Sequence, residues 1–323
     1  MGLYRYLVKR VVFSFAIVML TAFISFLLIK EAPGDPAVLL GGEGATPQYL
    51  DVIRQEYGLN LPLTQQLLIY FEHLLTGNLG YSITYGQPVV TVIMERLPNT
   101  LLLVGTAFVF SIILGVILGM LAAAKPYSIR DRIISSLSLI LYSTPVFVTG
   151  LILIYVFVIK VHLFPPGGMF SIGSQTNLLA LSASIAYHMV LPVLALSTFF
   201  LATYTLLTRS GLIEALNMNY VTMARAKGVS ERRTLTVHAL RNALLPIVTV
   251  AGVQLGLIVT GAVLTENIFS WPGIGTLLIQ AVEYRDFPLV TGIFIFTAIS
   301  VAIANLAADI VYGIVDPRIR SEA

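Results

Sequence analysis

The sequence predicts an all-α membrane protein with six transmembrane helices. Of its 323 residues, 57% are hydrophobic and only 11% are charged, whereas soluble domains carry about one charged residue in four. Lys and Arg residues gather in alternate connections between the apolar segments. Six segments approach or exceed the roughly 20 residues that a helix needs to cross the hydrocarbon core: residues 11–29, 100–124, 133–159, 185–207, 244–265 and 287–312.

The first apolar segment follows the basic sequence MGLYRYLVKR, which raises the alternative of a secretory signal peptide. Its apolar part is longer than the roughly 7–15 residues usual in such signals, and the KEAPGDP that follows is a poor cleavage site. We therefore interpret this segment as a retained first transmembrane helix.

The placement of Lys and Arg predicts the orientation, because cytoplasmic connections of membrane proteins are enriched in both. With the N-terminus inside, fourteen of these residues fall on the cytoplasmic side and five on the outer side, which together make the nineteen in the chain. We expect both termini in the cytoplasm and an even number of spans in a multi-pass protein.

The outer segment between the first two spans, residues 30–99, is expected to be helical. Thr46 suits an N-cap and Gly58 a left-handed helix end. A second helix is expected to end at Gly77, and its apolar face would consist of Leu63, Leu67, Tyr70, Phe71, Leu74 and Leu75. These two amphipathic helices either lie on the membrane surface or cap the bundle, or else they shape an outer vestibule or contact an external partner.

The largest cytoplasmic connection, residues 208–243, is predicted to form two helices joined at a glycine. No helix breaker occurs between Glu214 and Lys227, and Gly228 is a natural C-terminal stop. Ser230 is expected to cap the second helix, with Glu231 favourably placed in its first turn.

Three interpretations of this basic connection compete. It could anchor the chain to anionic lipid headgroups, or bind nucleic acid, or dock on a soluble cytoplasmic partner. It lacks the density of basic and aromatic residues that nucleic-acid sites use, so we expect no nucleic-acid partner. Lipid anchoring accounts for the charge but not for the two helices and the central glycine.

Polar side chains are scarce inside the predicted spans. Asp309 lies near the inner end of the last span, and Glu266 and His188 fall at outer ends. Gln254 and Asn305 lie farther in, where they either form interhelical hydrogen bonds or contact a transported solute. This scarcity argues against a proton-coupled or sodium-coupled secondary transporter.

Several kinds of catalytic and cofactor site are excluded or disfavoured. The chain has no cysteine, and its four histidines show no metal-ligand spacing. It contains no G-x-x-x-x-G-K-[ST] motif, so ATP binding of the P-loop type is excluded. An intramembrane enzyme would need a nucleophile paired with a base, and no Ser stands at a recognisable spacing from His188.

The chain resembles the permease subunits of binding-protein-dependent ABC importers, most closely the dipeptide/oligopeptide/nickel subfamily. The basic connection matches in NYVTMARAKGVSERR (219–233) and HALRNALLPIVT (238–249). Seven further matches, in order along the chain, are APGDP (32–36), EYGLNLPLTQQ (56–66), GNLGYS (77–82), ERLPNTL (95–101), ENIFSWPGIGTLL (266–278), YRDFP (284–288) and DPRIR (316–320). The chain departs from the general motif at Thr222, where Glu is usual, and from the subfamily at Asn219, where Asp is frequent.

The resemblance implies one permease domain, residues 1–323, with the type I ABC importer fold, in a prokaryotic cytoplasmic membrane. It implies a second homologous permease, two cytoplasmic ATPase subunits that bind ATP and Mg²⁺, and an external solute-binding protein. This chain would then need no cofactor and would not itself be an enzyme. The residues implied in ATPase coupling are Tyr220, Met223, Ala224, Arg225, Ala226, Lys227, Gly228 and Ser230.

Within that set, Arg225 and Lys227 would supply charge at the rim of the docking helix, and Gly228 would permit the tight reversal. Arg232 and Arg233 would face solvent or lipid headgroups. The expected solutes are oligopeptides, with oligosaccharides or nickel chelates as the alternative. An ATP-independent channel or a secondary transporter is the alternative from a different class.

Overall fold

The structure is a computed structural model that describes residues 3–31, 35–42, 44–56, 58–255 and 262–315. The described chain is mostly helical, and its one two-stranded sheet pairs β1 (Tyr81–Ser82) with β2 (Gln87–Pro88) in antiparallel register. The long helices are α1 (Leu3–Glu31), α5 (Val89–Ala123), α8 (Leu178–Leu216), α11 (Leu240–Leu255) and α14 (Phe287–Val315).

Shorter helices connect these rods. Three of them, α2 (Pro36–Gly41), α3 (Pro47–Glu56) and α4 (Leu63–Leu75), form the segment after α1. The others are α6 (Ile129–Ser143), α7 (Val146–Leu153) with the π-helix Ile154–Lys160, the 3₁₀ turn Ser174–Thr176, α9 (Asn219–Ala226), α10 (Glu231–Arg233) with the π-helix Thr234–Ala239, α12 (Val263–Ile268) and α13 (Ile274–Glu283).

Four helices of the described chain are long and apolar enough to cross a membrane: parts of α1 and α14, and the whole of α5 and α8. Two bent pairs bring the number to six if each pair is counted as one span. The helical membrane class is therefore supported, whereas the count of six transmembrane helices is not confirmed.

The span predicted at residues 133–159 is wrong as a single helix. The chain bends by 105° between α6 and the helix that starts at Val146. Thr144 lies in the extended region, with φ −85° and ψ 123°, and Pro145 follows it. Proline disfavours the helical conformation of the residue before it, so Pro145 ends α6 even though the whole stretch is apolar.

Two other spans differ in length from their predictions. Helix α5 begins at Val89, so the predicted outer segment 30–99 contains its first three turns. Helix α8 is 39 residues long and takes up part of the predicted connection 208–243. The second half of the predicted span 244–265 falls largely on residues 256–261, and the DPRIR match falls on residues 316–320, both outside the described residues.

Helices α5 and α8 pack closely because two glycines lie at their contact. A Cβ atom built on Gly115 would lie 2.6 Å from Cβ of Tyr204, and one built on Gly119 would lie 2.4 Å from Cβ of Thr208. The G-x-x-x-G spacing of the two glycines is typical of close helix pairs in membranes. The core around this contact contains Leu103, Phe108, Tyr204 and Trp271, all buried.

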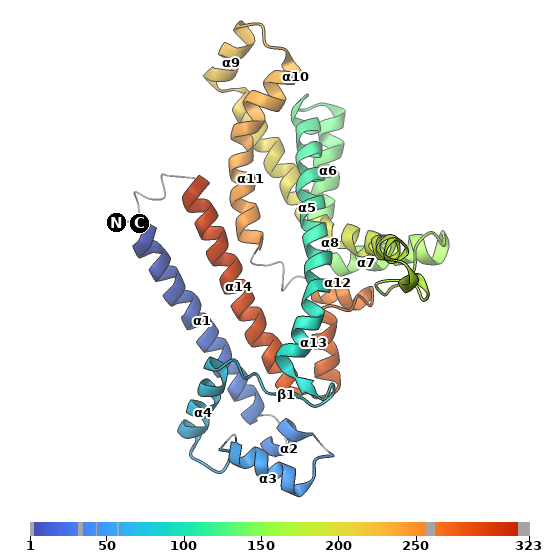
Figure 1. Ribbon diagram of the computed structural model, residues 1–323. Helices are drawn as coiled ribbons and strands as arrows, with labels where there is room; N and C mark the ends of the chain where they lie inside the picture. Colours follow the sequence, from blue (N-terminus) through green and yellow to red (C-terminus); the bar gives the residue numbers. More distant parts are fainter. Residues whose placement is uncertain (1–2, 32–34, 43, 57, 256–261, 316–323) are drawn as a thin grey trace.

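The segment α2–α4 lies at one end of the molecule and α9 and α10 at the other, while α1 runs beside α14 (Figure 1). The helix ends predicted at Gly58 and Gly77 are confirmed, because these residues have φ values of +58° and +79°. Thr46 accepts a hydrogen bond from the backbone N–H of Tyr49, as an N-cap does.

The apolar face predicted for the second outer helix is partly wrong. Leu63 and Leu75 are 51% and 68% exposed, whereas Gln66 is 5% exposed. The Gln66 amide donates to the carbonyls of Leu59 and Leu61, at 3.0 and 2.8 Å. These bonds satisfy the polar side chain, so α4 can bury a glutamine where the sequence pattern favoured leucine.

Candidate coupling site

The predicted helix–glycine–helix segment is present, with different bounds, and we call residues 219–233 the elbow. Glu214, expected to start its first helix, lies instead in the last turn of α8. The side chain of Asn217 donates to the carbonyl of Ile213 at 2.9 Å, and Met218 is extended, so the chain leaves α8 there and starts α9 at Asn219. A single asparagine is a weak helix-end signal, which explains the wrong boundary.

Gly228 ends α9 in the left-handed conformation, with φ +78°. Its N–H donates to the carbonyl of Arg225 at 2.9 Å, and the N–H of Val229 donates to the carbonyl of Ala224 at 3.2 Å. This pair of bonds is a Schellman motif, which favours glycine at this position. No atom lies within 4 Å of a Cβ built on Gly228, so the requirement for glycine is one of backbone conformation alone.

Ser230 occupies the N-cap position of α10 with an extended backbone, φ −63° and ψ 150°. Its side chain makes no capping hydrogen bond, so the expected side-chain cap is wrong. Its carbonyl instead accepts the N–H of Thr234 at 2.9 Å, as the first bond of the helix that follows.

Arg225 and Glu231 form a two-bond ion pair across the elbow. Nε of Arg225 lies 2.9 Å from Oε1 of Glu231, and Nη2 lies 3.1 Å from Oε2. The charge of Arg225, expected to stand at the rim, is therefore matched by a carboxylate of the same chain. The pair joins α9 to the first residue of α10.

The outer face of α9 is exposed and partly apolar. Met223 is 61% exposed and Tyr220 is 38% exposed. Ala224, by contrast, is 9% exposed and Val221 fully buried, so both face the rest of the chain. Of the residues expected to couple, those on exposed surface are therefore Tyr220, Met223, Arg225, Ala226, Lys227, Gly228 and Ser230.

A buried ion pair holds the part of α8 that leads to the elbow. Asp131 of α6 is 1% exposed and receives two bonds from Arg209 of α8, of 2.5 and 2.8 Å. It also accepts the N–H of Tyr127 at 2.7 Å and the hydroxyl of Ser135 at 3.2 Å. The sequence identified Arg209 only as a cytoplasmic positive charge, because nothing in a linear pattern pairs it with Asp131.

Two of the sequence motifs meet at Glu266, which is fully buried. Its carboxylate accepts hydrogen bonds from the Thr100 hydroxyl at 2.7 Å and from the N–H groups of Gly275 and Thr276 at 2.7 and 3.3 Å. The carboxylate thus caps the N-terminus of α13, where the helix dipole favours negative charge. A Cβ on Gly273 would lie 2.3 Å from this carboxylate, which accounts for the glycine there.

Trp271 and Asp286 extend this structural role to neighbouring motifs. The indole N–H of Trp271 donates to the carbonyl of Asn99 at 2.9 Å, and the side chain of Asn99 donates to the carbonyl of Pro272 at 2.8 Å. Asp286 accepts the hydroxyl of Ser82 at 2.6 Å and the N–H of Thr84 at 3.0 Å. The motifs therefore join segments that are far apart in the sequence.

The two candidates for a solute path lie on different helices, α11 and α14. Gln254 of α11 is 7% exposed, and its Oε1 accepts the hydroxyl of Tyr204 at 2.5 Å. This contact is the interhelical hydrogen bond that was the alternative interpretation. Asn305 is exposed on α14 and lines a cavity of about 480 Å³ between α1 and α14.

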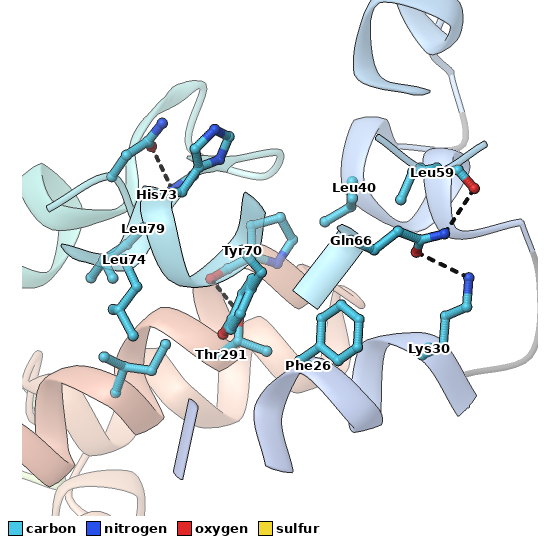
Figure 2. Close-up of a pocket in the computed structure, with 14 residues that line it drawn as sticks. Phe26, Lys30, Leu40, Leu59, Gln66, Tyr70, His73, Leu74, Leu79 and Thr291 are labelled. Carbon is cyan, nitrogen blue, oxygen red and sulfur yellow. Dashed lines mark hydrogen bonds between the residues drawn. The ribbon is translucent and has the colours of Figure 1, made fainter. Parts of the chain in front are cut away.

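A smaller pocket of about 70 Å³ lies where α4 packs on α1 and α14. Figure 2 shows Gln66 bridging Lys30 and Leu59, with the Tyr70 ring close to Phe26 and Thr291. The ring centroids of Tyr70 and Phe26 are 5.6 Å apart. The Tyr70 hydroxyl is buried without a hydrogen-bond partner among the described residues, and burial raises the pKa of Tyr70 to about 12.

Comparisons with known proteins cover nearly the whole chain. A family model described as "Binding-protein-dependent transport system inner membrane component" matches residues 115–321, and a model for the N-terminal part of such components matches residues 3–104. The chain is 38% identical over 315 residues to the oligopeptide transport system permease protein AppB of Bacillus subtilis, a match that covers 97% of this chain and 98% of AppB.

Two further relatives are similar to the same extent. The di/tripeptide transport system permease protein DppB of Pseudomonas aeruginosa is 39% identical over 314 residues, which cover 93% of this chain and 94% of that protein. The dipeptide transport system permease protein DppB of Escherichia coli is 38% identical over 315 residues, which cover 92% and 93%.

Proposed function

Because the chain belongs to the family of binding-protein-dependent transport system inner membrane components, we propose that it forms, with a second homologous permease, the translocation path of an ATP-driven importer. Two cytoplasmic ATPase subunits and an external solute-binding protein complete the proposed assembly. The chain has no P-loop motif, so ATP and Mg²⁺ would be bound by the ATPase subunits.

In the proposed topology the chain crosses the cytoplasmic membrane six times, with both termini inside. Two of the six spans are then the bent pairs that begin with α6 and with α10. The elbow and the segment α2–α4 lie at opposite ends of the molecule (Figure 1), which agrees with the orientation that Lys and Arg placement favours.

The observation that carries the coupling role is the exposed face of α9. Met223 and Tyr220 project apolar surface from a short helix, and the Gly228 turn and the Arg225–Glu231 pair hold that helix against α10. A short helix held this way fits a groove on a soluble partner. Closure of the two ATPase subunits would then move α9 and α10 together and shift α8 and α11, which continue from them.

We propose oligopeptides as the solutes, because the relatives described above are named for oligopeptide, dipeptide and di/tripeptide transport. Oligosaccharides and nickel chelates are the alternatives within the same machinery. Binding measurements on the partner solute-binding protein, with peptide and oligosaccharide libraries in parallel, distinguish these classes. Tight binding of oligosaccharides but not peptides would overturn the peptide assignment.

A matched pair of proline substitutions tests the coupling role. Gly228 and Gly77 have φ values of +78° and +79°, and no atom lies within 4 Å of a Cβ on either. Proline fixes φ near −65° and has no N–H, so it disrupts both helix ends in the same way. We expect Gly228→Pro to abolish co-purification of the ATPase subunits and solute-stimulated ATP hydrolysis, and Gly77→Pro to retain the ATPase subunits.

A milder variant checks the docking face itself. Met223→Glu places a charge on the exposed face of α9, whereas Thr236→Glu places one on an exposed position beyond the elbow. We expect only Met223→Glu to release the ATPase subunits. If Met223→Glu, Thr236→Glu and Gly228→Pro all retained the ATPase subunits, the elbow would not be the docking site. Solute flux that needs no ATP would favour a channel instead.

A further inference from the structure

A cavity of about 430 Å³ lies behind the elbow, between α10 and the turn that joins α5 to α6. Its walls include Ala123, the last residue of α5, and Leu216, the last residue of α8. Each of these helices contains an apolar stretch long enough to span a membrane. The predicted span 100–124 ends at Ala123 and Ala124, which line the cavity, so the cavity lies near the depth of the lipid headgroups.

The lining of the cavity combines two arginines, one glutamate and one asparagine with apolar side chains. Arg225 and Arg232 line it, and Lys125 stands between the lining residues Ala124 and Pro126. Arg225 is paired with Glu231, whereas Arg232 takes part in none of the ion pairs found among the described residues. One guanidinium group at the cavity is thus unmatched by a carboxylate there.

The apolar part of the lining comes from the elements that meet below the elbow. Ile213 and Leu216 belong to α8, and Leu235 follows α10. Tyr127, in the turn between α5 and α6, and Ile129, the first residue of α6, are each 76% exposed. Exposed aromatic and aliphatic side chains next to basic ones are typical of a surface that meets the membrane interface.

We propose that this cavity binds the headgroup of an anionic phospholipid, with Arg232 as the ligand of its phosphate. Guanidinium groups bind phosphate oxygens through paired hydrogen bonds, and basic pockets at the cytoplasmic ends of transmembrane helices bind anionic headgroups. A cavity of about 430 Å³ has room for several water molecules, and therefore for a phosphate-bearing headgroup. The bound lipid would tie the elbow to the membrane surface.

A phospholipid fits the lining better than a free phosphate does. A free phosphate would use the guanidinium group but would leave Ile213, Leu216 and Leu235 in contact with water. The glycerol and the first acyl carbons of a lipid satisfy both features of the site.

Arg232 and Arg233 provide a matched test, because both are exposed and only Arg232 lines the cavity. The full chain is placed in nanodiscs that contain photoactivatable phosphatidylglycerol in a phosphatidylcholine background, and crosslinks are mapped to residues 123–126, 213–217 and 225–235. We expect Arg232→Gln to lower crosslinking there about fivefold, which corresponds to roughly 1 kcal/mol for one cation near anionic lipid. Arg233→Gln should leave the crosslinking yield within about a factor of two of the wild-type value.

Each other outcome overturns the assignment in a distinct way. An equal loss of crosslinking in Arg232→Gln and Arg233→Gln would indicate that diffuse surface charge attracts the lipid. Equal crosslinking by photoactivatable phosphatidylcholine would show that the site does not require an anionic headgroup. Displacement by millimolar glycerol phosphate would indicate a free-phosphate site. Loss of labelling when the ATPase subunits are added would indicate that a protein occupies the cavity.

The lipid-site proposal rests on the proposed function only for the choice of the membrane leaflet that the elbow faces. Both faces of a nanodisc carry the labelled lipid, and the measurement needs no ATP. Failure of the lipid site therefore leaves the coupling role untouched. Failure of ATPase docking in Gly228→Pro leaves the crosslinking result intact.

Discussion

The Thr100 hydroxyl donates a 2.7 Å hydrogen bond to the carboxylate of Glu266, and each side chain is at most 1% exposed. The same Thr100 oxygen accepts the N–H of Ile274 at 2.8 Å. One hydroxyl thus connects α5, α12 and the first turn of α13. The two residues are 166 positions apart, and each belongs to a motif that the resemblance had marked.

Thr100→Val should lower the stability of the protein by about 2 kcal/mol, because it removes a hydrogen bond to a buried carboxylate and leaves the N–H of Ile274 without an acceptor. Thr100→Ser keeps the hydroxyl and should lose less than half of that. Thr106→Val is the control, since Thr106 is exposed and bonds only to its own helix at Leu102. The melting temperature in detergent measures all three. A Thr100→Val variant as stable as Thr106→Val would contradict the role of the hydroxyl.

Gly119→Ala should separate α5 from α8. The new methyl group would lie 2.4 Å from Cβ of Thr208 and 2.7 Å from the carbonyl oxygen of Thr205, and neither atom is the flexible end of a side chain. We expect a loss of about 2 kcal/mol from overpacking. Gly105→Ala lies on the same helix with nothing within 4 Å, so it should be neutral or stabilise by up to about 1 kcal/mol. Equal melting temperatures for the two variants would be incompatible with this contact.

Asp131→Asn and Glu231→Gln compare two ion pairs of similar geometry and different burial. The side chain of Asp131 is 2% exposed and that of Glu231 is 74% exposed. Removing the charge of Asp131 leaves Arg209 partly buried beside a neutral amide, so we expect a loss of about 3 kcal/mol. Glu231→Gln should cost less than about 1 kcal/mol. Denaturation of the two variants, followed by intrinsic fluorescence, checks the order.

Tyr70→Phe should raise the stability at neutral pH by about 1 kcal/mol, because it removes a buried hydroxyl that makes no hydrogen bond within the described structure. The difference in stability between Tyr70→Phe and the wild-type protein should increase above pH 10. Burial raises the pKa of Tyr70 to about 12 from 10.0, so the folded state holds the phenolic proton more tightly than the unfolded state does.

The sign of this pH dependence follows from linkage. Below pH 10 the phenol is protonated in both the folded and the unfolded state, so the raised pKa does not change the stability. As the pH rises from 10 towards 12 the phenol ionises more readily in the unfolded state, and the free energy of unfolding falls. The wild-type protein should therefore lose on the order of 2 kcal/mol more than Tyr70→Phe across that window. Parallel stability curves for the two proteins between pH 9 and pH 11.5 would contradict it.

The sequence predicts well those features that depend on one residue and its neighbours. Gly58, Gly77 and Gly228 were expected to end helices, and each has a positive φ. The bend at Thr144 was missed because a count of apolar residues ignores Pro145, although the restriction that proline places on the residue before it is a local signal. The G-x-x-x-G spacing of Gly115 and Gly119 was a second local signal that hydropathy does not register.

Features that depend on distant partners could not be predicted in this way. Glu266 was expected to stand at an outer helix end, and nothing within 20 residues of it identifies Thr100 as its partner. Gln66 was passed over because leucines surround it, and its burial depends on carbonyls that only the folded turn at Leu59 and Leu61 presents. Ala224 lies in the coupling motif yet faces inward, since the side of α9 that packs is decided by the helix after the elbow.

The 39 residues of α8 have one further consequence. At 1.5 Å per residue this helix is about 58 Å long, nearly twice the roughly 30 Å hydrocarbon thickness. A rod of that length displaces its tip by about 1 Å for each degree of tilt. A few degrees of rotation at the Arg209 end would therefore move the opposite end by the width of an atom or more, and small strokes would suffice to open or close a passage.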